Sequence, residues 1–398
     1  MNHPNRSSDP ATAAERPTPH PTLSEVPGRG LTVTRAWDLP QWGKHWGLRR
    51  LADADGFFSM VAVDQRPPIV NLVARARGIA PETVGFDDIV AVKALLAEGL
   101  AAHASALLVD PDFGLPAATP HLRPDRGLIL TLEEHRYDDT PGGRRSRAIP
   151  HWSVAQIRRL GADAVKLLAW YRPDAAPDVL AWQQAFVQQA GDDCAAHDTP
   201  FVFELLVHPF AAAPRATGAA AAAPAAPAAP DYSEDTAKQS RLVIESVRTF
   251  AHPRFGVDLF KLESPIPMAQ LPDPQGSHAA AAQALFDAMG AACGGVPWVL
   301  LSAGGSMQQF EHALVYACRA GASGFLAGRA VWWSALQAYP EATAVRAALQ
   351  HSAVPYLGQL RDIVARLGRP YRGTVDFSGV AQEGQVCLQR SRPAPPAV

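Results

Sequence analysis

The sequence predicts a single (β/α)₈ barrel, and three observations support this prediction. Eight short apolar runs recur along the chain, at 57–65, 106–114, 127–134, 164–171, 200–207, 259–266, 298–305 and 324–332. Amphipathic stretches lie between them, such as 89–104, 153–162 and 307–322. Continuous apolar runs are typical of parallel strands that are buried on both faces. Eight such units favour a closed barrel. An open doubly wound sheet is the alternative, but the GxGxxG turn expected after its first strand is absent.

The barrel is expected to occupy residues 37–375. Residues 1–36 and 376–398 are rich in Pro, Ser and Ala and lack periodicity, so we predict that both are disordered. An Ala/Pro-rich segment at 211–232 interrupts the domain, and its repeated prolines forbid a continuous helix. Because the strand and helix pattern continues on both sides, we interpret this segment as a loop insertion.

Composition excludes several classes of protein. The formal net charge is only -2, which gives no reason to expect nucleic acid or an acidic membrane as a partner. The four cysteines form no CxxC pair, so neither a disulfide framework nor a zinc site is expected. The N-terminus has no apolar signal region and no run of 18 apolar residues exists, which predicts a cytoplasmic protein. The sequence leaves the oligomeric state open, a homo-oligomer included.

Two lysines interrupt the apolar runs, Lys166 in 164–171 and Lys261 in 259–266. A charged residue inside a barrel strand is costly to bury unless it is paired or used. One run separates the two, so both ammonium groups can approach one cavity. A lysine amine is nucleophilic only when neutral, and burial or a neighbouring cation lowers its pKa. The pair therefore predicts Schiff-base chemistry with a carbonyl substrate, and lysines that merely extend from the rim are the alternative.

Carboxylates accompany the lysines. Glu204, in 200–207, is predicted to lie between them and to transfer protons, although an ion pair alone would also explain it. Asp64 ends the first run and is the other predicted catalytic carboxylate, and Gln65 and Arg66 follow it as candidates for substrate binding. The remaining strand-end carboxylates are Glu133, Glu134, Glu263 (expected on the same strand face as Lys261), Asp110 and Asp112 (interpreted as loop caps).

The last two runs end in glycine-containing turns, where barrels of this kind commonly bind phosphate. Ser302 and Gly304 follow one run, and Gly328 and Arg329 the other. Glycines let backbone N–H groups approach an anion, and the planar guanidinium suits a tetrahedral oxyanion. We therefore predict an oxyanion site there; two tight turns with a paired arginine are the alternative.

Histidines are scattered, with no HxH or HExxH motif, so a metal-dependent enzyme is not expected and no cofactor is predicted. His208, just after the run at 200–207, is the one rim histidine. We interpret it as a solvated loop residue.

The chain resembles the class I aldolases that include tagatose-1,6-bisphosphate aldolase and sulfofructosephosphate aldolase. The segments 60–66, 162–174, 258–267, 298–304 and 320–332 carry the resemblance and span nearly the whole ordered domain. The long segment 320–332 is the most specific of them, and the lysine in 258–267 is the mechanistic signature.

By this resemblance, Lys261 matches the Schiff-base lysine, Lys166 and Glu204 the assisting lysine and acid/base glutamate, and Asp64 the polar end of the first strand. The oxyanion-binding turns are matched by Ser302, Gly304, Gly328 and Arg329. The family implies a lyase of carbohydrate metabolism that splits a ketose phosphate into dihydroxyacetone phosphate and a three-carbon aldehyde. Residues 134–152 look nearer the tagatose branch and the last run nearer the sulfosugar branch, so both substrates stay open. The insertion and the long N-terminal extension depart from the family pattern.

Two alternatives come from other classes. A non-catalytic barrel that senses a sugar phosphate would have less reason to keep a buried lysine together with Glu204 and Arg329. A metal-dependent lyase would need the histidine cluster that this sequence lacks.

Overall fold

A computed structural model describes residues 42–210, 234 and 237–373. The predicted extensions at 1–36 and 376–398 and the insertion at 211–232 lie outside this part of the chain. No helix in the described part is long and apolar enough to cross a membrane.

Eight parallel strands of the described chain close into a barrel in the order β1-β2-β3-β6-β7-β8-β9-β10, with β10 paired to β1. The predicted barrel is confirmed, and the open-sheet alternative is wrong. Each apolar run named above contains one strand: β1 (Phe58–Ala62), β2 (Ala106–Val109), β3 (Gly127–Thr131), β6 (Ala164–Trp170), β7 (Phe201–Leu206), β8 (Leu259–Leu262), β9 (Trp298–Leu300) and β10 (Gly324–Ala327). A separate antiparallel hairpin, β4 (Asp138–Thr140) and β5 (Gly143–Arg145), interrupts the loop between β3 and β6.

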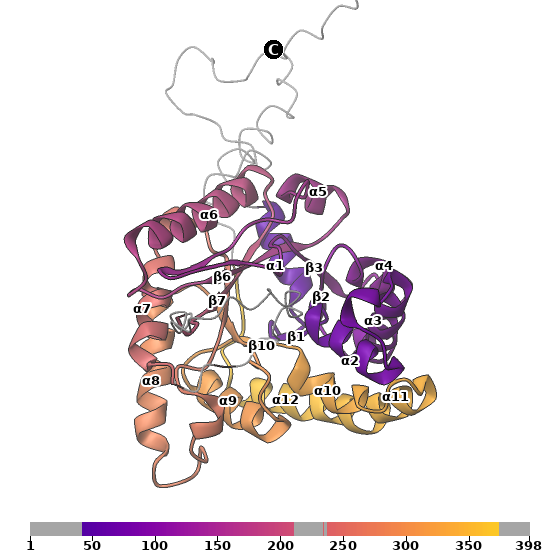
Figure 1. Cartoon of the computed structure of the whole chain (residues 1–398). Coiled ribbons are helices and arrows are strands. Elements are labelled where there is room, and N and C mark those ends of the chain that lie inside the picture. The colour runs from indigo at the N-terminus through magenta and orange to yellow at the C-terminus, as the bar shows by residue number, and fades with distance from the viewer. Residues whose placement is uncertain (1–41, 211–233, 235–236, 374–398) are drawn as a thin grey trace, which may run out of the picture. The chain divides into compact units, whose positions relative to one another are not determined.

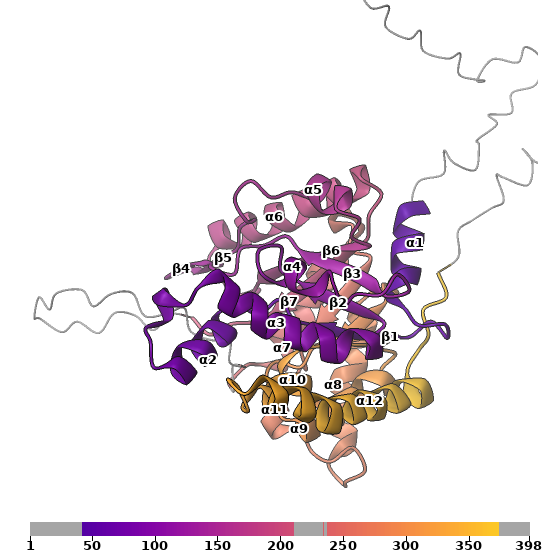
Figure 2. The same cartoon turned by 90° about the vertical axis from the view of Figure 1, so that its right-hand side faces the viewer.

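Helices surround the barrel, as Figures 1 and 2 show. The α-helices are α1 (Trp42–Leu51), α2 (Pro67–Arg77), α3 (Phe86–Leu100), α4 (Gly114–Ala118), α5 (Val154–Arg159), α6 (Pro177–Ala196), α7 (Ser240–Phe250), α8 (Ala279–Ala292), α9 (Met307–Arg319), α10 (Arg329–Leu336), α11 (Ala342–Ala348) and α12 (Val354–Leu367). Short 3₁₀ turns are η2 (Pro81–Thr83), η3 (Ala101–His103), η4 (Pro253–Phe255) and η5 (Met268–Gln270), and η6 (Leu349–Ala353) is a π-helical turn.

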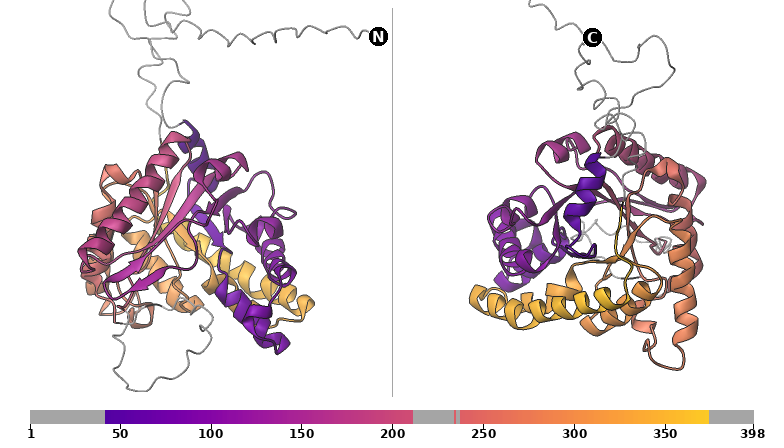
Figure 3. Two further views of the ribbon diagram at one scale, coloured as in Figure 1. Left: turned by 45° about the horizontal axis from the view of Figure 1, so that its top comes forward. Right: turned by 180° about the vertical axis from the view of Figure 1, so that it is seen from behind.

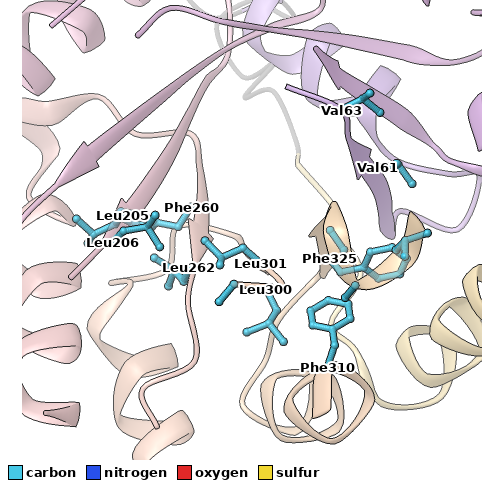
Figure 4. Close-up of a cluster of buried hydrophobic side chains, with 14 of the residues drawn as sticks. Val61, Val63, Leu205, Leu206, Phe260, Leu262, Leu300, Leu301, Phe310 and Phe325 are labelled. Carbon is cyan, nitrogen blue, oxygen red and sulfur yellow. The ribbon is translucent and has the colours of Figure 1, made fainter. Parts of the chain in front are cut away.

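The hydrophobic core has two parts because strand side chains alternate between the two faces of the barrel wall. Outward-facing residues pack under the helices, as Figure 4 shows for Phe325 of β10, whose ring meets Phe310 of α9 edge to face at 6.3 Å. Inward-facing residues such as Met60 and Val299 fill the barrel itself.

Helix α1 closes the end of the barrel where the strands begin, and it is visible from behind in Figure 3. Its Leu48 and Leu51 belong to the cluster that fills the barrel interior. The Nζ of Lys44 lies 2.7 Å from Asp258, just before β8. In barrels of this kind, the polar side chains of the active site lie at the opposite end, where the strands finish.

Candidate active site

A cavity of about 290 Å³ opens at the carboxyl ends of the barrel strands. Its wall contains all ten residues that the sequence singled out as catalytic or substrate-binding candidates: Asp64, Gln65, Arg66, Lys166, Glu204, Lys261, Ser302, Gly304, Gly328 and Arg329. They come from β1, β6, β7, β8, β9 and β10 or from the residues that follow these strands. Closing the barrel therefore brings together side chains that are far apart in the sequence.

Lys166 points from β6 into a set of three carboxylates. Its Nζ lies 2.5 Å from Glu133, 2.7 Å from Glu204 and 3.1 Å from Asp64. Burial disfavours the charged form of Lys166, but the three carboxylates outweigh burial and raise its pKa well above the ordinary value. The cation expected near Lys261 is thus present, but it comes with three anions that compensate much of its charge.

Lys261 on β8 lies beside Glu204, one of the three carboxylates that contact Lys166. Glu204 on β7 and Lys261 on β8 are register partners, and the Nζ of Lys261 lies 2.9 Å from Oε2 of Glu204. That oxygen also faces Lys166, so Glu204 lies between the two lysines, as the sequence predicted. The side chain of Lys261 is only 4% exposed, so its amine is held in a buried, polar position within reach of the cavity.

Asp64 follows β1 and contacts Lys166 from across the barrel. Burial alone would raise the pKa of Asp64, but the two lysines 166 and 261 outweigh it and lower the pKa to about 2. Asp64 is therefore a permanently ionised group at neutral pH. It can orient a ligand or balance charge, but it holds protons poorly.

Glu133, two residues after β3, is a member of this cluster that the sequence analysis named only as one of several strand-end carboxylates. Its Oε1 accepts hydrogen bonds from Lys166 and, at 2.9 Å, from the Thr131 hydroxyl. Its Oε2 is buried and has no hydrogen-bond partner among the described residues. The pKa of Glu133 is raised, first by burial and further by the charges of Asp64 and Glu204, although Lys166 acts to lower it. Glu134 follows it directly, so the sequence alone could not distinguish the two.

The turns after β9 and β10 form one end of the cavity. A Cβ on Gly304 (φ +83°) would lie 3.0 Å from the Cζ of Arg329, so glycine lets the guanidinium approach the backbone. A Cβ on Gly328 would lie 2.8 Å from the Nε2 of Gln65, which explains glycine at the second turn. Ala303 between Ser302 and Gly304 has a φ of +44°, which is uncommon for a residue with a side chain.

Arg329 is the first residue of α10, so the cavity is lined at this end by the N-terminus of a helix together with a guanidinium. Such an arrangement suits an oxyanion. The indole of Trp332 donates to the carbonyl of Ala62 at 2.9 Å and thereby fixes the start of α10 against β1. Arg66 comes just after β1 in the chain, and its Nη1 lies 3.1 Å from Nδ1 of His135 and 3.5 Å from Glu134.

A third arginine lines the cavity, in addition to Arg66 and Arg329, and it is not among the site residues expected from the sequence. Arg144, on the β4–β5 hairpin, has its Cζ 4.2 Å from the ring centre of Tyr137 and 4.7 Å from that of Trp170. Its side chain is 13% exposed, it contacts Asp139 at 3.6 Å, and its Nε has no hydrogen-bond partner in the described part of the chain. Trp170 is four residues beyond Lys166 on β6, or about 13 Å along a strand. The sequence signal for this site is a local group of basic residues, Arg144, Arg145 and Arg147.

Several residues outside the cavity differ from expectation. Glu263 does not share the face of Lys261, because β8 ends at Leu262. Its carboxylate instead accepts from the Val207 N–H at 2.6 Å and from Lys238 at 2.8 Å. His208 is 1% exposed rather than solvated, and burial lowers its pKa to about 4.

Asp110 has the role expected of it. Asp110 caps the turn after β2, accepting from the Phe113 N–H at 2.8 Å, and it also pairs with buried Lys93. The buried cysteines, Cys194, Cys293 and Cys318, are free thiols. No group of three or more His, Cys, Asp or Glu in residues 42–210, 234 and 237–373 is arranged to hold a metal ion.

Comparison with known proteins gives concordant matches. A family model described as DeoC/LacD family aldolase matches residues 58–334. Tagatose 1,6-diphosphate aldolase of Lactococcus lactis subsp. lactis is 30% identical over 340 residues, which cover 83% of this chain and 98% of that protein. Tagatose 1,6-diphosphate aldolase of Streptococcus agalactiae serotype V (strain ATCC BAA-611 / 2603 V/R) is 34% identical over 300 residues, or 74% of this chain and 86% of that protein.

Solved structures share the fold. Fructose-bisphosphate aldolase from Plasmodium falciparum, in complex with TRAP and a small-molecule inhibitor, superposes with a TM-score of 0.54 at 11% identity. The match covers 83% of this chain and 95% of that one. At this identity the likeness concerns the barrel architecture alone.

Proposed function

The chain belongs to the DeoC/LacD family and is a class I aldolase related to the tagatose 1,6-bisphosphate aldolases, and on this basis we propose that it cleaves a ketose phosphate through a Schiff base on Lys261. The observation that supports the proposal most is the buried amine of Lys261, which lies 2.9 Å from Glu204 in a cavity that Gly304, Gly328 and Arg329 also line. The products would be dihydroxyacetone phosphate and a three-carbon aldehyde.

The chemistry begins when the neutral amine of Lys261 adds to the ketone carbon of the substrate. The resulting carbinolamine loses water, and the lysine nitrogen becomes an iminium that withdraws electrons from the neighbouring carbon. A base then takes the proton of the hydroxyl on the second carbon from the iminium carbon. The bond that joins this carbon to the carbon next to the iminium breaks, and the aldehyde leaves. The remaining enamine is protonated on carbon and hydrolysed, which returns the amine and releases dihydroxyacetone phosphate.

Each group of the cavity has a proposed part in this sequence. Glu204 is close enough to Lys261 to take and return its proton. Lys166 supplies a fixed positive charge beside Glu204, and Asp64 supplies a fixed negative charge. Ser302, Gly304, Gly328 and Arg329, with Gln65 and Arg66 on the flanks of β1, would bind the phosphate next to the ketone and the neighbouring hydroxyls.

The second cationic end of the cavity favours a substrate with an anion at each terminus. Arg144 would hold the terminal group that is released with the aldehyde. A guanidinium can donate hydrogen bonds to either a phosphate or a sulfonate. Tagatose 1,6-bisphosphate is the first candidate because the family relatives carry that name. Sulfofructose phosphate is the second candidate. We further propose a cytoplasmic enzyme with a small-molecule substrate rather than nucleic acid or a membrane as its partner, since the net charge is only -2.

The test is borohydride trapping in the presence of dihydroxyacetone phosphate, followed by peptide mass spectrometry. The reduced triose phosphate should be found on Lys261 in the wild-type chain and in the Lys166→Met variant at low yield, and should be lost in Lys261→Met. An adduct on Lys166, or an active enzyme with no adduct, would contradict the assignment. Prolonged chelation in parallel should leave turnover intact, whereas loss with recovery on adding zinc would indicate a metal-dependent lyase.

Substrate identity needs a separate panel of phosphorylated ketoses and sulfofructose phosphate, assayed for dihydroxyacetone phosphate release. Release from a bisphosphate, a sulfonate or both identifies the substrate class. Binding without release from any member would favour a sugar-phosphate sensor instead of an enzyme.

A further inference from the structure

Four buried charged groups form an unbroken line of contacts in the cavity wall. The line runs from Lys261 to Glu204 over 2.9 Å, from Glu204 to Lys166 over 2.7 Å, and from Lys166 to Glu133 over 2.5 Å. None of the four residues is more than 7% exposed. Cation and anion alternate along the line, so each neighbouring pair can exchange a proton.

Such a line meets a requirement of the proposed function. Lys261 must lose a proton before it can attack a ketone, and its side chain is only 4% exposed. Glu204 can accept that proton, but a protonated Glu204 could not serve as a base in the later steps. Asp64 is a poor acceptor because its pKa is about 2. The proton therefore needs a resting place farther along the line.

We propose that Glu133 stores the proton that Lys261 loses, and that Glu204 and Lys166 carry it there. Lys166 gives its proton to Glu133, Glu204 returns a proton to Lys166, and Lys261 gives its own proton to Glu204, in one linked shift along the contacts. Glu204 and Lys166 end as they began, the amine of Lys261 becomes neutral, and the carboxyl of Glu133 becomes neutral. The net charge of the buried cluster does not change, which avoids the cost of burying an additional unpaired charge.

The stored proton is used when the carbinolamine loses its hydroxyl. That hydroxyl leaves as water and needs one proton, which returns from Glu133 by the reverse path. The sum is one ammonium and one ketone going to one iminium and one water, with Glu133 again ionised. The inference thus rests on the proposed Schiff base at Lys261 and identifies the route of its proton.

Two observations favour Glu133 as the store. Its Oε2 is buried and unpartnered among the residues that the structure describes, whereas its Oε1 is held by Lys166 and by the Thr131 hydroxyl. The pKa of Glu133 is raised by burial, so a proton rests there more readily than on Asp64. The charged groups that face Glu133 are Lys166, Asp64 and Glu204. Glu134 and His135 follow Glu133 in the chain, and both contact Arg66.

The experiment measures how fast the imine forms with dihydroxyacetone phosphate, by quenching with borohydride at set times and measuring the adduct on Lys261 between pH 5 and pH 10. Wild-type imine formation should slow as pH falls through the raised pKa of Glu133, because an already protonated carboxyl cannot accept another proton. Glu133→Gln keeps the shape but cannot accept the proton. At pH 7 its imine formation should be about a hundredfold slower, and its rate should rise with hydroxide concentration.

Two further variants separate the relay from a structural role. Glu133→Asp keeps a carboxyl and should restore part of the rate together with its acid limb, and this variant decides the question if Glu133→Gln does not fold. Glu134→Gln changes the adjacent cavity carboxylate, which is outside the line of contacts, and should keep the wild-type shape of the pH profile.

Wild-type rate and pH profile in Glu133→Gln would overturn the relay while leaving the proposed function standing. The relay would also be overturned if the slow rate of Glu133→Gln did not rise with hydroxide concentration and Glu133→Asp were equally slow, with no acid limb in its pH profile. That result would indicate a structural role for Glu133. Failure of the wild-type chain to form the adduct on Lys261 would instead contradict the proposed function itself.

Discussion

Glu204 on β7 and Lys261 on β8 are register partners whose charged atoms lie 2.9 Å apart at the carboxyl end of the barrel. Side chains at paired positions of neighbouring strands point to the same face, so the backbone pairing itself sets this contact. The geometry does not depend on a mobile loop. It leads directly to the first prediction.

Glu204→Gln should slow imine formation by roughly a hundredfold or more at pH 7, because the amide cannot take the proton of Lys261. The fold should persist, since Lys166 keeps Asp64 and Glu133 as counter-charges. Timed borohydride trapping measures the rate, and thermal unfolding checks the fold. A folded variant with wild-type trapping kinetics would show that Glu204 only balances charge.

Arg329→Ala should lower kcat/KM by roughly tenfold to a hundredfold, because a charge-assisted contact to an oxyanion contributes about 1.5–3 kcal/mol. Trapping at saturating substrate should still label Lys261, since the amine is untouched. The loss should be much smaller for a ketose that lacks the anion beside the carbonyl. Equal losses with charged and uncharged ketoses would make Arg329 a structural residue.

Arg144→Met should discriminate between substrates at the other terminus. Methionine keeps a flexible apolar side chain between Tyr137 and Trp170 but has no donor for an anion. We expect kcat/KM to fall by roughly tenfold or more for a ketose with a terminal phosphate or sulfonate, and far less for one with a terminal hydroxyl. Arg145→Met on the same hairpin is the control, since Arg145 pairs with Asp178 outside the cavity. The prediction fails if both variants lose activity alike, or if Arg144→Met does not discriminate by charge.

His208 should make the protein less stable in mild acid. Burial, with help from nearby Arg144 and Arg172, lowers its pKa from about 6.5 to about 4. Between these values the unfolded chain binds a proton that the folded chain does not, so stability falls as pH drops from 6.5 toward 4. The loss from this one group is at most roughly 3 kcal/mol.

The measurement is chemical denaturation at pH 7 and pH 4.5 for the wild-type chain and for His208→Asn. Asparagine can imitate the hydrogen bond from Nδ1 to the Pro209 carbonyl, but it does not titrate. The variant should lose less free energy of unfolding on acidification than the wild-type chain. An equal loss in both proteins would mean that His208 titrates normally.

Much of the fold could be predicted because a parallel barrel imposes a simple pattern on the chain. Strands buried on both faces require uninterrupted apolar runs, and any charged residue within them is conspicuous. Lys166, Glu204 and Lys261 were identified in that way, and the cavity wall contains all three. The register of β7 and β8 then determines a contact that spacing along the chain could only suggest.

The residues that escaped prediction do so for physical reasons. Arg144 comes from a hairpin whose position over Trp170 depends on tertiary packing, and no periodicity signals that position. Lys93 and Lys238 look like ordinary helix and loop lysines, although both are buried against carboxylates from distant segments. Glu263 was assigned to the wrong face because its strand ends one residue earlier than alternation assumes.

The contact of Lys166 with Glu204 has a consequence for how this chain can be divided. Asp64, Glu133 and Lys166 come from the first four barrel strands or the residues that follow them, whereas Glu204, Lys261, Ser302 and Arg329 come from the last four. A chain divided between β6 and β7 would give two fragments, each with one of the two cavity lysines, and would separate Lys166 from Glu204. Catalysis would then require the fragments to recombine, so turnover in a complementation assay would report the joining of the two halves into one barrel.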